Sequence, residues 1–518
     1  MMPTNFLQKI LNNCLQTPDK TAIELIDDDN QSTTITYAQL AANIDHATHF
    51  LQQFDIQTGD RVALQLPKSL TFIYLYFATI RLNAIALPLN TAYPAQELHY
   101  YLEDAAASLF IADKAQQDEL APLQQQIPTL THLHFINPFA TDDILATAPT
   151  DLTIPAPTTM ANSQTILWGP DDQTALMIYT SGTTGRPKGA EITLGNLTAN
   201  LQDLHQAWGW QENDILLHVL PIFHVHGLIV ALHGALYAGA TTIMLTRFDA
   251  AQALQLLQDR LCTVFMGVPT IHQRLLAVPN AANYNLAHMR LLTSGSDRLA
   301  DDVFAAFQNT FGHTLLERYG MTETGMNLSN PLDGERRPGS VGFPLPSVEV
   351  RIVDRETDEI LGDDQVGEVQ IRGPHVCKGY WRQPEKTKAA FTPDGWLRTG
   401  DLGLRQPDGY HILKGRDKDL IITGGYNVYP PEVELVLKEY PGVAACAVIG
   451  CPNEEWGETV TAVIIPTPNT ILNPDAIIDH CCQKLAKYKA PRHIIFADEL
   501  PRNALGKVQK ARLRQSLC

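Results

Sequence analysis

The chain has 518 residues, of which 45% are hydrophobic and 18% are charged. This length exceeds what a single hydrophobic core normally supports, so we expect a large domain and a smaller one. The 38 Lys plus Arg residues against 56 Asp plus Glu give a formal net charge of −18. Such a surface repels phosphate backbones and anionic lipids, which disfavours nucleic acid and membranes as partners.

Cysteine usage and hydropathy predict where the protein works. The eight cysteines are scattered, with no CxxC pair and no histidine spacing typical of zinc, so we expect reduced thiols in a cytosol. The first residues contain no apolar run of the length that a signal peptide needs. The nearly uncharged stretch 227–245 is interrupted by glycine and paired threonines, and it is expected to be a buried helix followed by a buried strand. These features predict a cytoplasmic protein with no integral membrane segment.

The first part of the chain alternates between two kinds of pattern. Short β-rich runs (TAIEL, RVALQLP, AIALPL and SLFIA) alternate with helical patterns at 37–54 and 93–106. This order is typical of a parallel sheet with helices on its faces. Residues 114–170 are rich in Gln, Pro and Thr and are predicted to form a variable surface connection.

Alternation resumes from residue 173 to about 321, with candidate strands such as TALMIYT, TTIMLT and TVFMGVP. From 339 to 414 short strands separated by turns predict a small antiparallel barrel or sheet. The charged run RDKD then precedes a final segment with its own strands and helices. We therefore expect an α/β protein with an N-terminal domain at 1–415, including the barrel-like β subdomain, and an α+β C-terminal domain at 416–518.

The strongest motif is YTSGTTGRPKG, at 179–189, which follows an apolar strand. Its three glycines, three hydroxyl side chains and one lysine form a loop that can surround phosphate oxygens. Lys188 is followed by Gly189, where the P-loop of ordinary NTPases needs Ser or Thr. The motif predicts a polyphosphate ligand held by a different kind of loop.

This loop resembles the signature of the adenylate-forming superfamily, which includes acyl-CoA synthetases, luciferases and peptide-synthetase adenylation domains. Further family motifs follow in order along the chain: LPIFHVHGL, RYGMTETGMN, WLRTGD, GRDKDLIITGGYNVYPPEVE and PRNALGKVQK. The resemblance implies an AMP-binding enzyme that uses ATP and Mg²⁺ to convert a carboxylic acid into an acyl-adenylate. It implies that the acyl group then passes to coenzyme A, with release of AMP and pyrophosphate.

The resemblance also assigns the nucleotide site. An aromatic face on Tyr319 suits adenine, the hydroxyl of Thr322 suits the α-phosphate, and the carboxylate of Glu323 suits Mg²⁺. Asp401 can accept both ribose hydroxyls. The full implied set is Thr180, Ser181, Gly182, Thr183, Thr184, Gly185, Lys188, Ser296, Tyr319, Gly320, Thr322, Asp401 and Arg416.

The C-terminal domain carries a lysine that the resemblance makes catalytic. Lys507 is expected to hold the attacking carboxylate and the α-phosphate during adenylation, a task that suits a flexible point charge. In the family this domain then rotates about a hinge, here at Lys418. The rotation replaces the lysine with a glycine loop, here Gly424 and Gly425, and opens a tunnel for the thiol.

The acyl pocket is expected to lie around His224, which the resemblance places among the catalytic and substrate-binding residues. With Arg274, Ser296 and Met326 it looks like the pocket of malonyl-CoA synthetases, in which an arginine pairs with the distal carboxylate. The sequence departs from that pattern at Asp297 and Arg298. A carboxylate facing the pocket would repel a dicarboxylate unless Arg298 neutralised it.

Other activities are compatible with the same motifs. One is a fatty acyl-CoA synthetase for a monocarboxylate, and another is a stand-alone adenylation enzyme that loads a carrier protein. Luciferase chemistry also proceeds through an adenylate. A nucleotide-binding regulator without catalysis would have lost Lys188, Glu323 or Lys507, and all three are present. Small-molecule substrates are the expected partners.

Overall fold

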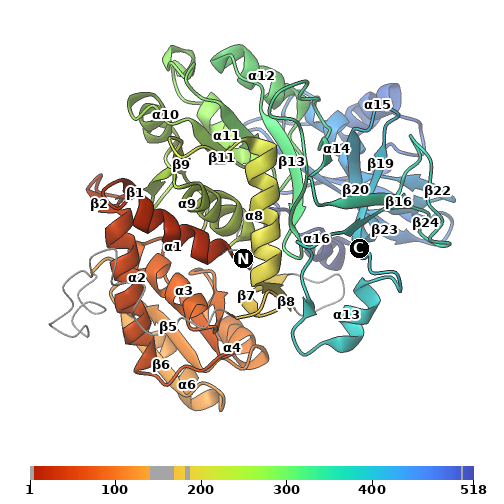
Figure 1. Ribbon diagram of the computed structural model, residues 1–518. Helices are drawn as coiled ribbons and strands as arrows, with labels where there is room; N and C mark the ends of the chain where they lie inside the picture. Colours follow the sequence, from red (N-terminus) through yellow and green to blue (C-terminus); the bar gives the residue numbers. More distant parts are fainter. Residues whose placement is uncertain (1–4, 141–168, 181–186, 503–505) are drawn as a thin grey trace. The chain divides into compact units, whose positions relative to one another are not determined.

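The computed structural model describes residues 5–140, 169–180, 187–502 and 506–518. The chain divides into two compact units (Figure 1). The first comprises residues 1–349 and 371–397, and the second comprises 350–370 and 398–518. The predicted mixture of helices with parallel and mixed sheets is confirmed.

One sheet of the first unit has nine strands in the order β15-β14-β13-β12-β11-β9-β10-β1-β2. Its central strands pair in parallel, while the edges at β1–β2 and β13–β14–β15 are antiparallel. The strands are β1 (Thr21–Ile26), β2 (Ser32–Thr36), β9 (Ile215–His218), β10 (Thr241–Leu245), β11 (Val264–Gly267), β12 (Leu291–Ser294), β13 (Leu316–Met321), β14 (Gly325–Ser329) and β15 (Phe343–Pro344).

The other sheet of this unit has seven strands in the order β18-β8-β7-β4-β3-β5-β6. They are β3 (Arg61–Gln65), β4 (Ile85–Pro88), β5 (Leu109–Asp113), β6 (His132–Ile136), β7 (Thr174–Thr180), β8 (Lys188–Thr193) and β18 (Gly379–Tyr380). β6 corrects the expectation that 114–170 is only a connection, because its backbone pairs in parallel with β5. The hydropathy pattern did not reveal this strand, because the run HLHFI is not strongly apolar and most of its side chains are only half-buried.

The helices of the first unit cover these sheets. Four buried side chains of one cluster (Leu98, Tyr101, Leu102 and Phe110) show how α4 packs on strand β5. The helices are α1 (Phe6–Gln16), α2 (Tyr37–Gln52), α3 (Leu70–Arg81), α4 (Ala95–Asp104), α5 (Gln117–Leu120), α6 (Leu123–Gln126), α8 (Leu194–Trp208), α9 (Gly234–Ala238), α10 (Ala250–Asp259), α11 (Pro269–Leu276), α12 (Asp301–Phe311) and α13 (Pro384–Ala390).

Helix α8, yellow in Figure 1, contacts both β8 and β14. A capping box fixes its start, because the Thr193 hydroxyl accepts from the Asn196 N–H and the Asn196 amide oxygen accepts from the Thr193 N–H. The Asn196 side-chain amide also donates to the carbonyls of Pro374 and Val376, each at 2.8 Å. This helix therefore holds the segment that leads into β18.

The second unit contains two further sheets. The predicted small β subdomain is a four-stranded sheet made of β16 (Glu349–Val353), β17 (Gly367–Arg372), β19 (Leu397–Arg405) and β20 (His411–Arg416). The other sheet contains β21 (Ile421–Thr423), β22 (Tyr426–Val428), β23 (Val443–Asn453), β24 (Gly457–Pro466) and β25 (His493–Phe496). Its helices are α14 (Pro430–Lys438), α15 (Pro474–Lys484) and α16 (Lys510–Leu517).

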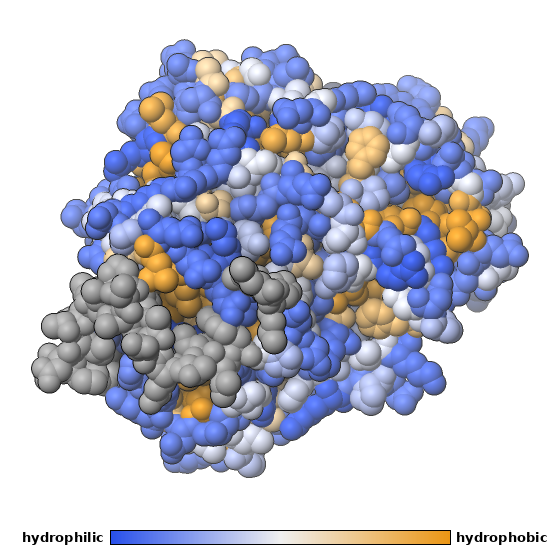
Figure 2. All heavy atoms as spheres, in the orientation of Figure 1, coloured by the Kyte–Doolittle hydropathy of each residue, from blue (hydrophilic) through white to orange (hydrophobic). Residues whose placement is uncertain are grey.

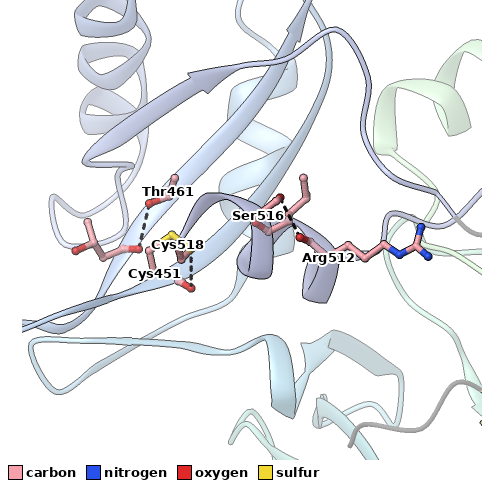
Figure 3. The surroundings of a disulfide bond; sticks show 8 residues. Cys451, Thr461, Arg512, Ser516 and Cys518 are labelled. Atoms are coloured by element: carbon pink, nitrogen blue, oxygen red, sulfur yellow. Dashed lines mark hydrogen bonds between the residues drawn. A yellow bond between two sulfur atoms is a disulfide. The ribbon is translucent and has the colours of Figure 1, made fainter. Parts of the chain in front are cut away.

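One disulfide corrects the expectation that every cysteine is a reduced thiol. Cys451 of β23 is bonded to Cys518, the last residue of the chain, and their Cα atoms are 5.2 Å apart (Figure 3). Spacing along the sequence could not reveal this pair, since 67 residues separate the two cysteines and only the fold brings them together. The other six cysteines are free.

The stretch 227–245 folds as predicted, with one refinement. It forms the π-helix η2 (His226–His233), helix α9 and strand β10, and nearly all of its side chains are buried. In the described part of the chain, no helix is both long enough and apolar enough to cross a membrane. On the face drawn in Figure 2, hydrophobic residues form separate small patches among hydrophilic ones.

Candidate active site

Strands β7 and β8 frame the predicted phosphate loop. β7 ends at Thr180, β8 begins at Lys188, and these two residues are register partners in an antiparallel pair. The two ends of the loop therefore lie side by side. The loop residues between them, at 181–186, lie outside the described residues, and they include Ser181, Gly182, Thr183, Thr184 and Gly185.

A carboxylate and a lysine flank the ends of this loop. Glu323 is 7% exposed, and its Oε1 accepts hydrogen bonds from the Thr180 hydroxyl at 3.3 Å and the Tyr380 hydroxyl at 3.1 Å. The Lys188 Nζ lies 3.8 Å from the centroid of the Tyr380 ring. Burial lowers the pKa of Lys188, and the negative charge of Glu323 opposes that shift. The site thus presents an ammonium group and an oxygen ligand next to the phosphate loop.

The hairpin of β13 and β14 carries three more predicted residues, Tyr319, Gly320 and Thr322. Tyr319 is buried and Thr322 is half-buried. Gly320 allows the two strands to approach closely, because a Cβ there would lie 2.1 Å from the Gly325 carbonyl oxygen. Asn200 of α8 holds the far strand, since its side chain donates to the Met326 carbonyl at 2.8 Å and accepts from the Met326 N–H at 3.1 Å.

The structure brings together the SGS turn and the predicted histidine. Ser296 follows β12 in a left-handed conformation, with φ of +68°. This conformation is rare for serine and is often found at functional sites. The Ser296 Oγ lies 3.3 Å from Nδ1 of His226, and the His226 N–H donates to Nδ1 of His224 at 3.2 Å. Burial lowers the pKa of His226 well below its ordinary value, with a further contribution from Arg318, so this imidazole is neutral at pH 7.

Arg318 is a candidate that the sequence interpretation missed. It is 4% exposed, and its guanidinium lies against Gly295 of the SGS turn, where a Cβ would be 2.4 Å from Cζ. Its Nε and Nη2 have no hydrogen-bond partner among the described residues. Burial lowers the pKa of Arg318 to about 9, which still leaves it charged at pH 7. The available signal was the motif RYGMTETGMN itself, whose first residue is Arg318.

Arg274, the arginine predicted to bind substrate, has a different environment. It lies on the exposed face of α11, whereas Ile271 and His272 of the same helix are buried. Asp297 and Arg298 are also exposed, and the Asp297 Oδ1 accepts the Arg298 N–H at 2.8 Å. The Asp297 carboxylate therefore keeps its contact with solvent, and the effect predicted for a carboxylate that faces the pocket stays a prediction.

In the second unit, Asp401 and Arg416 are brought together as register partners on β19 and β20. Asp401 is 6% exposed, and its Oδ1 lies 2.7 Å from the Nε of Arg416. The backbone of Asp401 is also held in place, because its N–H donates to the Thr399 hydroxyl at 3.0 Å. Asp401 and Arg416 therefore form an ion pair within the second unit.

The remaining predicted residues also belong to the second unit. Lys418 is exposed in the short 3₁₀ turn η4 (Asp417–Asp419), which follows β20. Gly424 and Gly425 form the β21–β22 turn with φ of +58° and +80°, a conformation that favours glycine. Lys507 is half-buried and precedes α16, after residues 503–505, which lie outside the described residues.

Comparison with known proteins shows which family shares these features. Residues 11–381 match the family model of the AMP-binding enzyme, and residues 432–507 match that of the AMP-binding enzyme C-terminal domain. The chain is 36% identical over 492 residues to a mitochondrial malonate–CoA ligase of Mus musculus, covering 88% of this chain and 82% of that protein. It is 35% identical over 520 residues to an oxalate–CoA ligase of Arabidopsis thaliana, covering 98% of each.

Solved structures agree with this assignment. The crystal structure of ATP-bound MatB from Rhodopseudomonas palustris superposes with a TM-score of 0.90 at 39% sequence identity, covering 99% of both chains. The described residues place a lysine, a buried carboxylate and an aromatic ring around the ends of a glycine-rich loop, as expected for a nucleotide site. The chain therefore belongs to the AMP-binding enzyme family.

Proposed function

We propose that this protein is an AMP-forming malonate–CoA ligase. In the first step one carboxylate of malonate attacks the α-phosphorus of ATP, which forms malonyl-adenylate and releases pyrophosphate. In the second step the thiol of coenzyme A attacks the acyl carbon of the adenylate, which forms the thioester and releases AMP. As a member of the AMP-binding enzyme family, the chain is an acyl-CoA synthetase.

The observation that carries the choice of a dicarboxylate is the environment of Arg318. A buried cation without a carboxylate partner is costly, because it has lost its hydration shell. The neighbouring His226 is neutral at pH 7, so it adds no negative charge beside the Arg318 guanidinium. A distal carboxylate of the substrate would supply the missing counterion and could accept from Nε and Nη2. A monocarboxylate of the same length would leave the guanidinium unpaired.

The relatives support the same substrate class. One is named as a malonate–CoA ligase and another as an oxalate–CoA ligase, and both names describe short dicarboxylates. The ATP-bound MatB structure supports ATP as the nucleotide. These names apply to those proteins, and the buried guanidinium of Arg318 is the reason to extend a dicarboxylate to this chain.

The residues of the first unit fit the nucleotide and its metal. Lys188 and the loop from Thr180 would bind the phosphates, Tyr319 the adenine and Thr322 the α-phosphate. Glu323 suits Mg²⁺, because both of its hydrogen bonds from described residues fall on Oε1 and Oε2 can take the cation. No cluster of three or more potential metal ligands occurs among the described residues, so Mg²⁺ would be shared between Glu323 and phosphate oxygens. Bound Mg²⁺ would neutralise charge on the phosphates.

We assign the alternation of half-reactions to the segment 416–518. Asp401 and Arg416 would hold the ribose, and Lys507 would stabilise the charge that develops during adenylation. Rotation at Lys418 would then exchange Lys507 for the turn of Gly424 and Gly425 and admit the thiol. We further propose free coenzyme A as the acceptor. Loading of a carrier protein is the alternative acceptor reaction.

The test compares malonate with butyrate in the parent enzyme and in two variants, with ATP–pyrophosphate exchange as the measurement. Arg318→Met removes the buried charge while keeping most of the volume, and it should reduce kcat/KM for malonate by about 30-fold to several-thousand-fold. Butyrate activity should stay unchanged or rise. Arg274→Ala tests, by the same comparison of malonate with butyrate, whether the exposed arginine contributes to malonate binding. A parent enzyme that prefers butyrate would instead indicate a fatty acyl-CoA synthetase.

A further inference from the structure

Tyr380 links two charged residues that lie far apart in the sequence. It is 7% exposed, its hydroxyl donates to the Glu323 Oε1 at 3.1 Å, and its ring lies under the Lys188 Nζ at 3.8 Å from the centroid. The same side chain thus contacts the proposed metal ligand and the proposed phosphate ligand. Its hydroxyl and its ring contact different partners, so the two functions can be separated by mutation.

These contacts address an electrostatic problem of the site. Glu323 is buried and Lys188 is half-buried, and the negative charge of Glu323 raises the pKa of Lys188 against the effect of burial. Opposite charges in such a setting attract each other strongly. If Lys188 and Glu323 formed a direct ion pair, neither group could bind a ligand until that pair was broken, and MgATP would have to break it. Instead, the ammonium rests on an aromatic face and the carboxylate accepts two hydroxyl groups. Both charges stay available to ligands.

The backbone around Tyr380 is held in place from several sides. In β18, Tyr380 is the register partner of Ala190 in β8, and the Trp381 N–H donates to the Gly189 carbonyl at 2.8 Å. The Tyr380 N–H donates to the Thr387 hydroxyl at 2.9 Å. Gly379 permits this arrangement, because it has a φ of +146° and a Cβ there would lie 2.5 Å from Thr387 Cγ2.

The strand β18 is also tied to the metal ligand itself. The Cys377 N–H donates to the Glu323 carbonyl at 2.7 Å, three residues before Tyr380. Glu323 is therefore fixed by backbone and side-chain contacts with one segment. A side chain held this firmly is suited to set the geometry of its neighbours before the ligand arrives.

We propose that Tyr380 is a positioning residue for adenylation. Its hydroxyl donates to Oε1 of Glu323 and leaves Oε2 available, so that Glu323 could hold Mg²⁺, while its ring holds the Lys188 ammonium next to the phosphate loop. The inference rests on the proposed function only in taking MgATP as the ligand, and it does not depend on which acid is the substrate.

The experiment measures ATP binding by calorimetry in the absence of any carboxylic acid, so that no adenylate forms. Titrations with excess Mg²⁺ and with a chelator separate the two effects. Tyr380→Phe keeps the ring and removes the hydroxyl, so it should weaken binding of ATP roughly tenfold with Mg²⁺ and leave metal-free ATP binding within about twofold of the parent. Tyr380→Leu also removes the ring, so it should weaken metal-free ATP binding by about threefold to tenfold.

Tyr37→Phe is the matched control, because Tyr37 is also buried but its hydroxyl donates to the Ala240 carbonyl. It should lower the Tm without altering the ratio of ATP affinities with and without Mg²⁺. If Tyr380→Phe leaves that ratio as Tyr37→Phe does, the proposal is wrong. In a Glu323→Gln background, Tyr380→Phe should have no further effect on the ratio, and an undiminished effect there would equally overturn it. A parent protein that does not bind ATP would contradict the proposed function instead.

Discussion

Glu317 and Arg318 are consecutive residues of β13, are both buried and carry opposite charges. Because side chains alternate along a strand, they project to opposite faces of the sheet. The Glu317 Oε1 accepts the Gly339 N–H at 2.9 Å, whereas Arg318 lies against Gly295. Burial raises the pKa of Glu317 to about 7, since its hydrogen bonds only partly offset desolvation. Glu317 therefore does not pair with Arg318, whose Nε and Nη2 have no hydrogen-bond partner among the described residues.

The pKa of Glu317 predicts how stability depends on pH. Its carboxyl pKa is raised in the folded state above the reference value of 4.5, so this contribution to stability is fully present below pH 4.5 and is lost as pH rises through about 7. Glu317→Gln removes the titrating group and keeps an acceptor oxygen. Relative to the parent, the variant should gain about 3 kcal/mol between pH 5 and pH 8. The measurement is denaturant unfolding of both proteins at each pH.

Glu119→Gln provides the control, because Glu119 is an exposed carboxylate of the same unit. Its stability should follow that of the parent across the same pH range. Parallel curves for the parent and Glu317→Gln would show that Glu317 is ionised in the folded protein with an ordinary pKa.

At the scale of elements, the C-terminal helix α16 is short and depends on anchors. Only Leu513 of this helix is buried, and it packs with Ala447, Ile449 and Leu500. Two ion pairs add to this contact, Lys510 with Glu434 at 2.7 Å and Arg514 with Asp419 at 3.1 Å. The disulfide then fixes the end of the helix to β23. Because α16 begins three residues after Lys507, these anchors also restrain the backbone that follows that lysine.

The disulfide predicts a measurable stability difference. Cys518→Ser should destabilise the second unit by about 4 kcal/mol, because it releases a closed loop of 67 residues in the unfolded chain. Thermal unfolding under non-reducing conditions checks this value. Thiol titration of the denatured parent should give six reactive thiols without reductant and eight after reduction. Cys482→Ser, a change at a half-buried free thiol, should have a much smaller effect, and eight thiols without reductant would contradict the disulfide.

For the whole molecule, the prediction concerns the division of labour along the chain. Lys507→Ala should reduce adenylation by a factor of about 10² or more, because it removes one preorganised charge. The variant should still convert supplied malonyl-adenylate and coenzyme A into the thioester, since Lys507 is proposed to act in the first step only. The two half-reactions are measured separately, as ATP–pyrophosphate exchange and as thioester formation.

Lys484→Ala is a suitable control in the same unit, because Lys484 forms a largely exposed ion pair with Glu439. It should leave both half-reactions unchanged. Equal losses in the two steps for Lys507→Ala would rule out alternation between two arrangements of the segment 416–518.

The sequence alone determined the fold class and the family, and it predicted most of the strands and helices as well as the position of the phosphate loop between β7 and β8. These are local properties, since hydrophobic periodicity and motif spacing are read within short windows. The tertiary structure decided four other features. It placed Arg318 rather than Arg274 in a buried position, exposed Asp297, joined Cys451 to Cys518 and set Tyr380 between Lys188 and Glu323. Each depends on residues distant in the sequence, and only packing of separate elements decides which of them meet and which lose contact with water.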